Sequence, residues 1–203
     1  EIRFCDWSSD VCSSDLRAEA RIEELGISRA ADIDVDAIAA DAGITVRYAS
    51  LVGCEATLVG FGSRAIATIR HSTVRGRERF SVAHELGHWE LHRGQSFRCR
   101  VDEPDENLAS NAQLEREADQ FSSHLLMPAR LFNPAVCATR WPKLGEIQEV
   151  SRDFQTSQLA TLIRMANVDT LPVIVAGYTQ GQRRWNATAP HVPWPVLDRK
   201  SVV

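Results

Sequence analysis

The stretch RFSVAHELGHWELH at residues 79–92 is the strongest indication of the fold of this chain. It contains the pattern H-E-x-x-H, formed by His84, Glu85 and His88. In an α-helix, residues at i and i+4 lie on nearly the same face and about 6 Å apart along the axis, so two imidazoles at this spacing can reach one ion. The stretch contains no proline, and we predict a helix over residues 77–92 that presents two metal ligands.

Glu85 lies beside the two histidines, where a carboxylate can act as a general base. Imidazole nitrogens bind Zn²⁺ at about 2.0 to 2.1 Å, and zinc lowers the pKa of a water molecule toward about 7. A neighbouring carboxylate can then take the proton of that water. The pattern does not identify the group that stabilises the oxyanion, and Tyr48, His71 and His124 stay open as candidates.

Two other interpretations of the pattern compete with a metal site. The first is a solvated helix face with incidental histidines, and the second is a buried cluster whose polar groups satisfy one another. The residues around the pattern are mostly apolar, which indicates a largely buried helix. Such a helix does not carry His and Glu without partners, so the solvated face is the weaker alternative.

A catalytic zinc needs a third protein ligand, and the histidine helix does not supply one. In metzincins a third histidine follows six residues after the second, but position 94 of this chain is Gly. His92 lies two turns from His84, too far for three histidines to share one ion on a straight helix. We therefore expect His92 to serve in helix packing or capping.

A second predicted helix offers the missing ligand. Its apolar residues recur at helical spacing up to Pro128, and it carries Glu115 and Asp119 at i and i+4. Glu115 can therefore bind zinc while Asp119 orients one of the histidines through a hydrogen bond. Glu117 is the alternative ligand, and a solvated acidic helix face is the alternative for the whole group.

The preceding part of the chain indicates an α+β fold. Helical patterns end at Gly26 and Gly43, where glycine is a typical stop signal. Three apolar or β-branched stretches follow, at residues 44–48, 58–62 and 65–69. We expect these three stretches to form a small antiparallel sheet that precedes the histidine helix.

Both ends of the chain resemble translated sequencing-library adapters. DWSSDVCSSDL at residues 6–16 matches one adapter, residues 1–5 fit the bases before it, and DRKSVV at residues 198–203 matches the opposite adapter. A Ser- and Asp-rich tail is the alternative interpretation. We expect residues 17–197 to be the natural segment, cut from a longer protein.

Composition indicates a soluble globular protein of a reducing compartment. The 203 residues carry a formal net charge of −4, which gives no strong field toward nucleic acid or an anionic membrane. We predict no membrane-spanning helix, since no apolar run approaches the required length of about 18 residues. Outside the adapter-like ends, Cys54, Cys99 and Cys137 form no C-x-x-C pair, so we expect free thiols and a cytoplasmic location.

The histidine helix and the stretch EREADQFSSHLLMP at residues 115–128 together resemble the ImmA/IrrE metallo-endopeptidases. The departures are mild. Asp119 stands where Asn is commoner in that family, and Ser122 and Ser123 stand where Ala is commoner. Asp119 still supplies a hydrogen-bond acceptor. The resemblance extends over most of residues 35–167.

The resemblance implies a zincin-like metallopeptidase core over residues 17–140. One zinc ion would be held by His84, His88 and Glu115, with Glu85 as the general base. The expected reaction is a site-specific cut in a helix-turn-helix transcriptional repressor, in stress, DNA-damage or mobile-element regulation. The rival function is a non-proteolytic, zinc-containing regulatory module that binds and displaces the repressor. An intact Glu85 favours catalysis, because a structural zinc does not need that base.

A helix-turn-helix-like segment is expected at residues 141–170. Residues 147–154 and 157–167 have helical patterns joined by a short turn, and residues 171–197 begin a truncated C-terminal region with a strand near its start. The segment contains three basic and four acidic residues, so it lacks the excess of Lys and Arg that binds phosphates. We expect packing or repressor docking from it rather than direct contact with DNA.

Overall fold

The computed structural model of the chain describes residues 13–93, 108–137, 143–168, 172–190 and 192, with only the backbone described at 108–111. The adapter-like ends lie outside the described residues, except for residues 13–16, which begin the first helix. Cys99 also lies outside them. Helices and small sheets are combined in the described part, which confirms the predicted α+β class.

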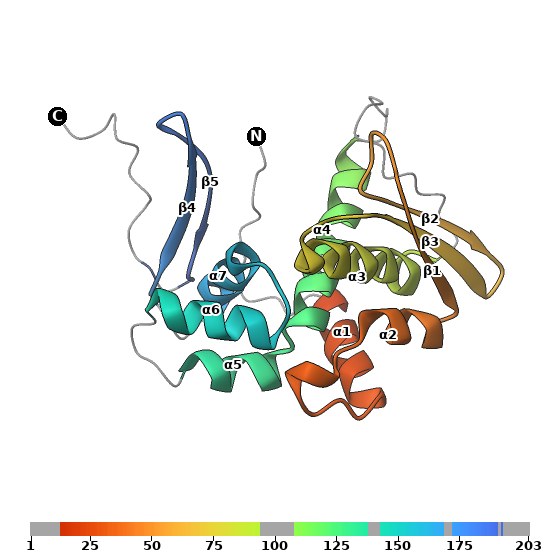
Figure 1. Cartoon of the computed structure of the whole chain (residues 1–203), viewed down its shortest axis with the longest axis horizontal. Helices are drawn as coiled ribbons and strands as arrows, with labels where there is room; N and C mark the ends of the chain where they lie inside the picture. Colours follow the sequence, from red (N-terminus) through yellow and green to blue (C-terminus); the bar gives the residue numbers. More distant parts are fainter. Residues whose placement is uncertain (1–12, 94–107, 138–142, 169–171, 191, 193–203) are drawn as a thin grey trace.

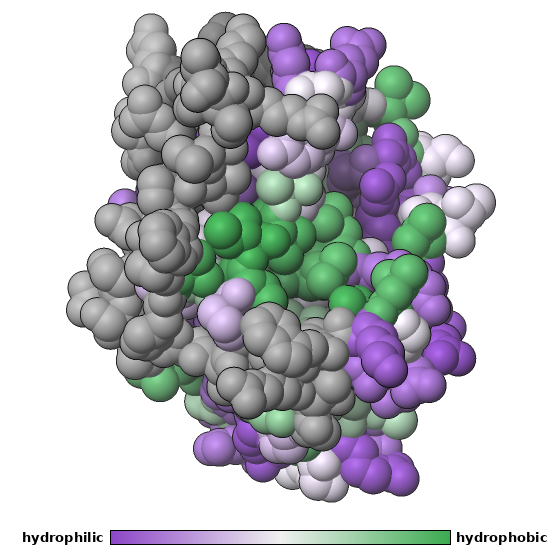
Figure 2. Space-filling model, turned by 90° about the vertical axis from the view of Figure 1, so that its left-hand side faces the viewer, coloured by the Kyte–Doolittle hydropathy of each residue, from purple (hydrophilic) through white to green (hydrophobic). Residues whose placement is uncertain are grey.

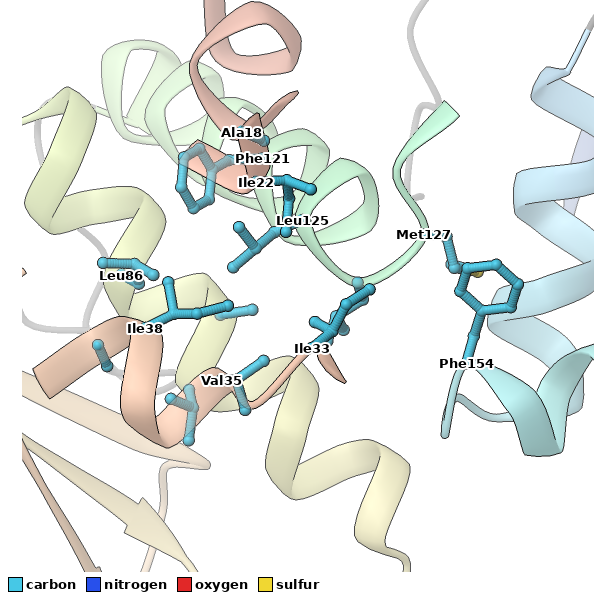
Figure 3. Close-up of a cluster of buried hydrophobic side chains, with 14 of the residues drawn as sticks. Ala18, Ile22, Ile33, Val35, Ile38, Leu86, Phe121, Leu125, Met127 and Phe154 are labelled. Atoms are coloured by element: carbon cyan, nitrogen blue, oxygen red, sulfur yellow. The ribbon is translucent and has the colours of Figure 1, made fainter. Parts of the chain in front are cut away.

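Four helices pack around one apolar core. They are α1 (Ser13–Glu24), α2 (Val35–Asp41), α3 (Arg75–Leu91) and α4 (Leu108–Leu126), and the short 3₁₀ helix η1 (Ala30–Asp32) precedes α2. Each of the four contributes buried side chains to the core, including Ile22, Ile38, Leu86, Phe121 and Leu125 (Figure 3). Because burying one such side chain stabilises the fold by about 1.5 to 3 kcal/mol, this core packs α3 firmly against α4.

A three-stranded sheet precedes α3 in the chain. Its strands are β1 (Ile44–Ala49), β2 (Ala56–Phe61) and β3 (Arg64–Arg70), in the order β1-β3-β2. Gly43, between α2 and β1, has φ +86°, and a β-carbon there would come within 2.7 Å of the Ser63 carbonyl oxygen. Only glycine fits this close approach to the turn between β2 and β3.

The expectation of an antiparallel sheet is wrong for β1. β2 pairs antiparallel with β3, but β1 pairs parallel with it, from Ile44 opposite Ala65 to Ala49 opposite Arg70. β3 takes the centre because its alternate residues Ala65, Ala67 and Ile69 are all buried against the helices. A parallel pair needs a crossover connection, and β2 with its flanking turns supplies it.

The C-terminal part adds three helices and a two-stranded antiparallel sheet (Figure 1). The elements are α5 (Ala129–Cys137), α6 (Leu144–Asp153), α7 (Gln158–Asn167), β4 (Ile174–Thr179) and β5 (Gln182–Thr188). Between α6 and α7 the chain turns at Gln155, which has φ 52°, and the Ser157 side chain caps α7 by accepting a hydrogen bond from the Ala160 amide. The two helices and the short turn lie close to the predicted ranges 147–154 and 157–167. Neither α5 nor β5 was predicted.

Apolar and polar contacts join the C-terminal part to α4 and the residues that follow it. Met127, just beyond α4, packs against Phe154, just beyond α6 (Figure 3). The buried guanidinium of Arg164 donates a hydrogen bond from Nε to the Met127 carbonyl oxygen at 3.2 Å. The end of α4 is thus held both by apolar packing and by a buried polar contact.

The side of the molecule that carries β4 and β5 has apolar side chains gathered at its centre (Figure 2). Exposed large hydrophobic residues of these C-terminal elements are Leu144, Leu159, Ile174 and Tyr178. None of the helices in the described ranges is both long and apolar enough to cross a membrane.

Candidate metal centre

His84 and His88 lie on successive turns of α3, on the side that faces α4. Their rings are 4.7 Å apart between centroids, and the two Nε2 atoms approach to 3.1 Å. The close approach of the two helices depends on Gly87, because a β-carbon there would lie 3.2 Å from the Ala118 Cα. A small residue at each of these positions lets the histidines of α3 reach side chains of α4.

Glu115 of α4 brings a carboxylate to the two imidazoles. Its Oε2 lies 3.1 Å from His84 Nε2, and its Oε1 lies 3.4 Å from His88 Nε2. Burial would raise the pKa of the Glu115 carboxyl, but hydrogen bonds from His84 and His88 outweigh it and hold the pKa well below its usual range. The carboxylate is therefore ionised and available as a ligand.

The spacing of these atoms fits a zinc ion. Three ligands at about 2.0 to 2.1 Å from a tetrahedral zinc lie about 3.3 to 3.4 Å from one another. The observed separations are 3.1 Å between the two Nε2 atoms and 3.1 and 3.4 Å from them to the Glu115 oxygens. Two imidazoles and one carboxylate are also the donor set of many catalytic zinc sites, so the residues present suit this metal.

Asp119 contacts Nδ1 of His84, the ring nitrogen that does not face Glu115. Its Oδ1 lies 3.0 Å from His84 Nδ1. A carboxylate only accepts hydrogen bonds, so Nδ1 carries a proton, and zinc ligation would use the Nε2 atom that faces His88 and Glu115. The structure thus gives Asp119 the contact that its i, i+4 relation to Glu115 predicts.

Glu85 is buried next to this group, with 1% of its surface exposed. No described residue hydrogen-bonds to its Oε1. Burial raises the pKa of the Glu85 carboxyl to about 7, His84 lowers it and the Glu115 charge raises it. A buried acceptor without a partner is costly, and such groups mark sites where a proton is handled.

His92 and Glu117 meet each other beside the site. His92 ends α3 and is buried, its Nδ1 lies 3.1 Å from His88 Nδ1, and its Nε2 lies 2.9 Å from Glu117 Oε2. Glu117, the alternative ligand, therefore contacts His92. Sequence reasoning missed this contact, although histidines at 84, 88 and 92 share one helical stripe and were a signal for it.

The three candidates for oxyanion stabilisation have their contacts elsewhere. The Tyr48 hydroxyl donates to the Asp36 carboxylate at 2.9 Å, and the His71 ring stacks on Tyr48. His124 Nε2 lies 2.9 Å from the Arg164 guanidinium. None of these contacts is with His84, His88 or Glu115. They therefore do not place Tyr48, His71 or His124 at the candidate metal centre.

Comparisons with known proteins show a similar fold and a family. The chain is similar in structure to a solved Mycobacterium tuberculosis transcriptional regulator, with a TM-score of 0.60 and 18% sequence identity. The match covers 87% of this chain and 55% of that one, so the chain spans about half the length of the regulator, and the likeness shows the fold alone. No curated protein sequence matches the chain. Residues 39–165 match the Peptidase_M78 family, described as the IrrE N-terminal-like domain, and the chain belongs to that family.

Proposed function

We propose that this chain is a zinc-dependent endopeptidase that makes a site-specific cut in a protein target. His84, His88 and Glu115 hold one zinc ion, Asp119 orients His84, and Glu85 is the general base. The observation that carries the proposal is the convergence of two Nε2 atoms and a carboxylate at 3.1 to 3.4 Å beside a buried glutamate whose Oε1 has no described partner. Membership of a metallopeptidase family supports the same chemistry.

The chemistry divides between the ion and Glu85. When bound, zinc acts as a Lewis acid that polarises the scissile carbonyl and makes water a stronger acid. Glu85 takes a proton from the attacking water at its carboxylate and passes it to the nitrogen of the leaving amine. Burial suits Glu85 to this role, because in the metal-free protein it raises the pKa of the carboxyl to about 7, which makes the carboxylate a stronger proton acceptor than an exposed one.

The target we propose is a helix-turn-helix transcriptional repressor, cleaved during stress, DNA damage or mobile-element regulation in the cytoplasm. The structural likeness to a transcriptional regulator supports a regulatory setting. The formal net charge of −4 supports recognition of a protein rather than of DNA. Residues 141–170 are the segment we propose for docking the repressor.

A cleavage assay tests this proposal. The zinc-loaded protein is incubated with the helix-turn-helix protein encoded beside it, and the products are identified by mass spectrometry. Wild type should give two fragments from one cut, and Glu85→Gln should give none while keeping its zinc. Glu23→Gln, which alters an exposed carboxylate on α1 outside the proposed docking segment, should cleave like wild type. Equal loss of repressor activity with wild type and Glu85→Gln, and no fragments from either, would favour the displacing module instead.

A further inference from the structure

His92 is buried next to a metal ligand and has no part in the reaction described above. It is 5% exposed, and the side chain of its neighbour His88 is 0% exposed. The two rings lie 5.3 Å apart between centroids, and their Nδ1 atoms are 3.1 Å apart. Water therefore has little access to the His88 ring, and its Nδ1 lies within hydrogen-bond distance of His92 Nδ1.

Glu117 fixes the direction of the hydrogen bonds through His92. The Glu117 carboxylate holds His92 Nε2 at 2.9 Å on one oxygen and accepts a hydrogen bond from the Gln113 amide at 2.9 Å on the other. Because an ionised carboxylate only accepts, His92 Nε2 carries the proton. With this single proton, the His92 ring keeps a lone pair at Nδ1, where His88 Nδ1 can donate a hydrogen bond.

From this order of donors and acceptors, we infer that His92 and Glu117 are positioning residues that hold His88 with its proton on Nδ1 and its Nε2 lone pair directed at the metal site. The inference rests on the proposed function, in which His88 Nε2 is a zinc ligand. The same tautomer is imposed on His84 by a direct contact with Asp119. One ligand thus has an adjacent carboxylate, and the other reaches a carboxylate through a second imidazole.

The two supports differ in their exposure to water. The Asp119 side chain is 59% exposed, so water can take over part of its role. The His92 side chain is 4% exposed and lies against a fully buried ring, so water has little access to take its place. Loss of a hydrogen bond behind a metal-bound histidine typically lowers metal affinity by about 10- to 100-fold. We expect the loss at His92 to fall in the upper part of this range.

A matched pair of substitutions at His92 tests the inference. Gln at position 92 offers an amide oxygen to His88 and an amide N–H to Glu117, whereas Leu offers neither. Zinc affinity is measured by competition with a chromogenic chelator, and thermal unfolding is followed in parallel. His92→Leu should lower zinc affinity by about 10- to 100-fold, and His92→Gln should restore much of it. Folded His92→Leu protein with wild-type zinc affinity would overturn the inference.

Substitutions at Glu117 and an NMR measurement cover the case in which His92→Leu does not fold. Glu117 is partly exposed, so Glu117→Leu leaves the core intact, and it should lower zinc affinity more than Glu117→Gln, which keeps an acceptor. In zinc-loaded wild type, long-range ¹H–¹⁵N spectra should show His92 protonated at Nε2 and not at Nδ1. A proton on His92 Nδ1 would overturn the inference. A wild-type protein that fails to bind zinc would instead overturn the proposed function.

Discussion

Gly87 of α3 lies directly against Ala118 of α4, so that a β-carbon at Gly87 would come within 3.2 Å of the Ala118 Cα and within 3.2 Å of the Phe121 ring. Gly87 stands between the two histidines in sequence, and Ala118 stands between Glu115 and Asp119. The contact therefore sets the distance between the two sets of candidate ligands.

Gly87→Ala should destabilise the protein and weaken zinc binding together. Alanine gains about 1 kcal/mol over glycine in a helix, but crowding a packed interface costs about 1 to 3 kcal/mol. We expect a net loss near 1 kcal/mol by urea unfolding. Gly145→Ala is the control, since nothing lies within 4 Å of its added β-carbon, and it should stabilise by about 0.4 to 1 kcal/mol. A Gly87→Ala protein with raised stability and unchanged zinc affinity would show that the helices do not need this contact.

Asp119→Ala should lower zinc affinity by about 10-fold, the lower end of the range for lost supporting hydrogen bonds, because the exposed Asp119 can be replaced in part by water. Asp119→Asn keeps an acceptor for His84 Nδ1 and should lose less. Isothermal titration with zinc separates the two variants. Equal affinity for all three proteins would mean that Asp119 does not orient His84.

Removal of zinc should abolish cleavage but leave the helices folded. The core residues Ile22, Phe121 and Leu125 are fully buried and do not depend on the ion. Zinc at 100 times its Kd should add about 2.7 kcal/mol to the free energy of unfolding, which raises the melting temperature without creating the fold. Far-UV circular dichroism before and after chelation measures this. Loss of the helical signal on chelation would point to a structural zinc.

Arg164→Met should loosen the C-terminal helices from α4. The Arg164 guanidinium is buried, which lowers its pKa, and it donates to the Met127 carbonyl oxygen. Leaving that oxygen buried without a partner costs about 1 to 3 kcal/mol. The control Arg152→Met alters an exposed arginine of α6 and should change the free energy of unfolding by less than about 0.5 kcal/mol. The two variants are compared by urea unfolding. Equal effects would show that Arg164 does not hold the C-terminal helices against α4.

Local patterns predicted the helices and strands better than their pairing. The helix at 77–92 and the pair at 147–154 and 157–167 lie close to α3, α6 and α7, because apolar periodicity and stop signals act within a few residues. The parallel pairing of β1 with β3 depends on which strand is most buried, and neighbouring residues do not encode that. α5 was missed because Pro134 lies inside it and proline normally ends a helix.

In the candidate site, too, local features were predicted better than contacts between helices. The spacing of His84 and His88 predicted their meeting, since one helix sets it. The choice of Glu115 over Glu117 agrees with the geometry, because the Glu115 oxygens lie 3.1 and 3.4 Å from the two Nε2 atoms. The contact of Glu117 with His92 joins two helices, and only their packing reveals it.

The division of the candidate ligands between α3 and α4 also sets an order of events during synthesis. Two of them, His84 and His88, are made first, and no single segment of chain holds all three in the observed arrangement. On the ribosome, the ion can be captured in this arrangement only after Glu115 has emerged and α4 has docked. Under the proposed function, zinc would then bind a chain that has already begun to fold, and cleavage would begin only after that point.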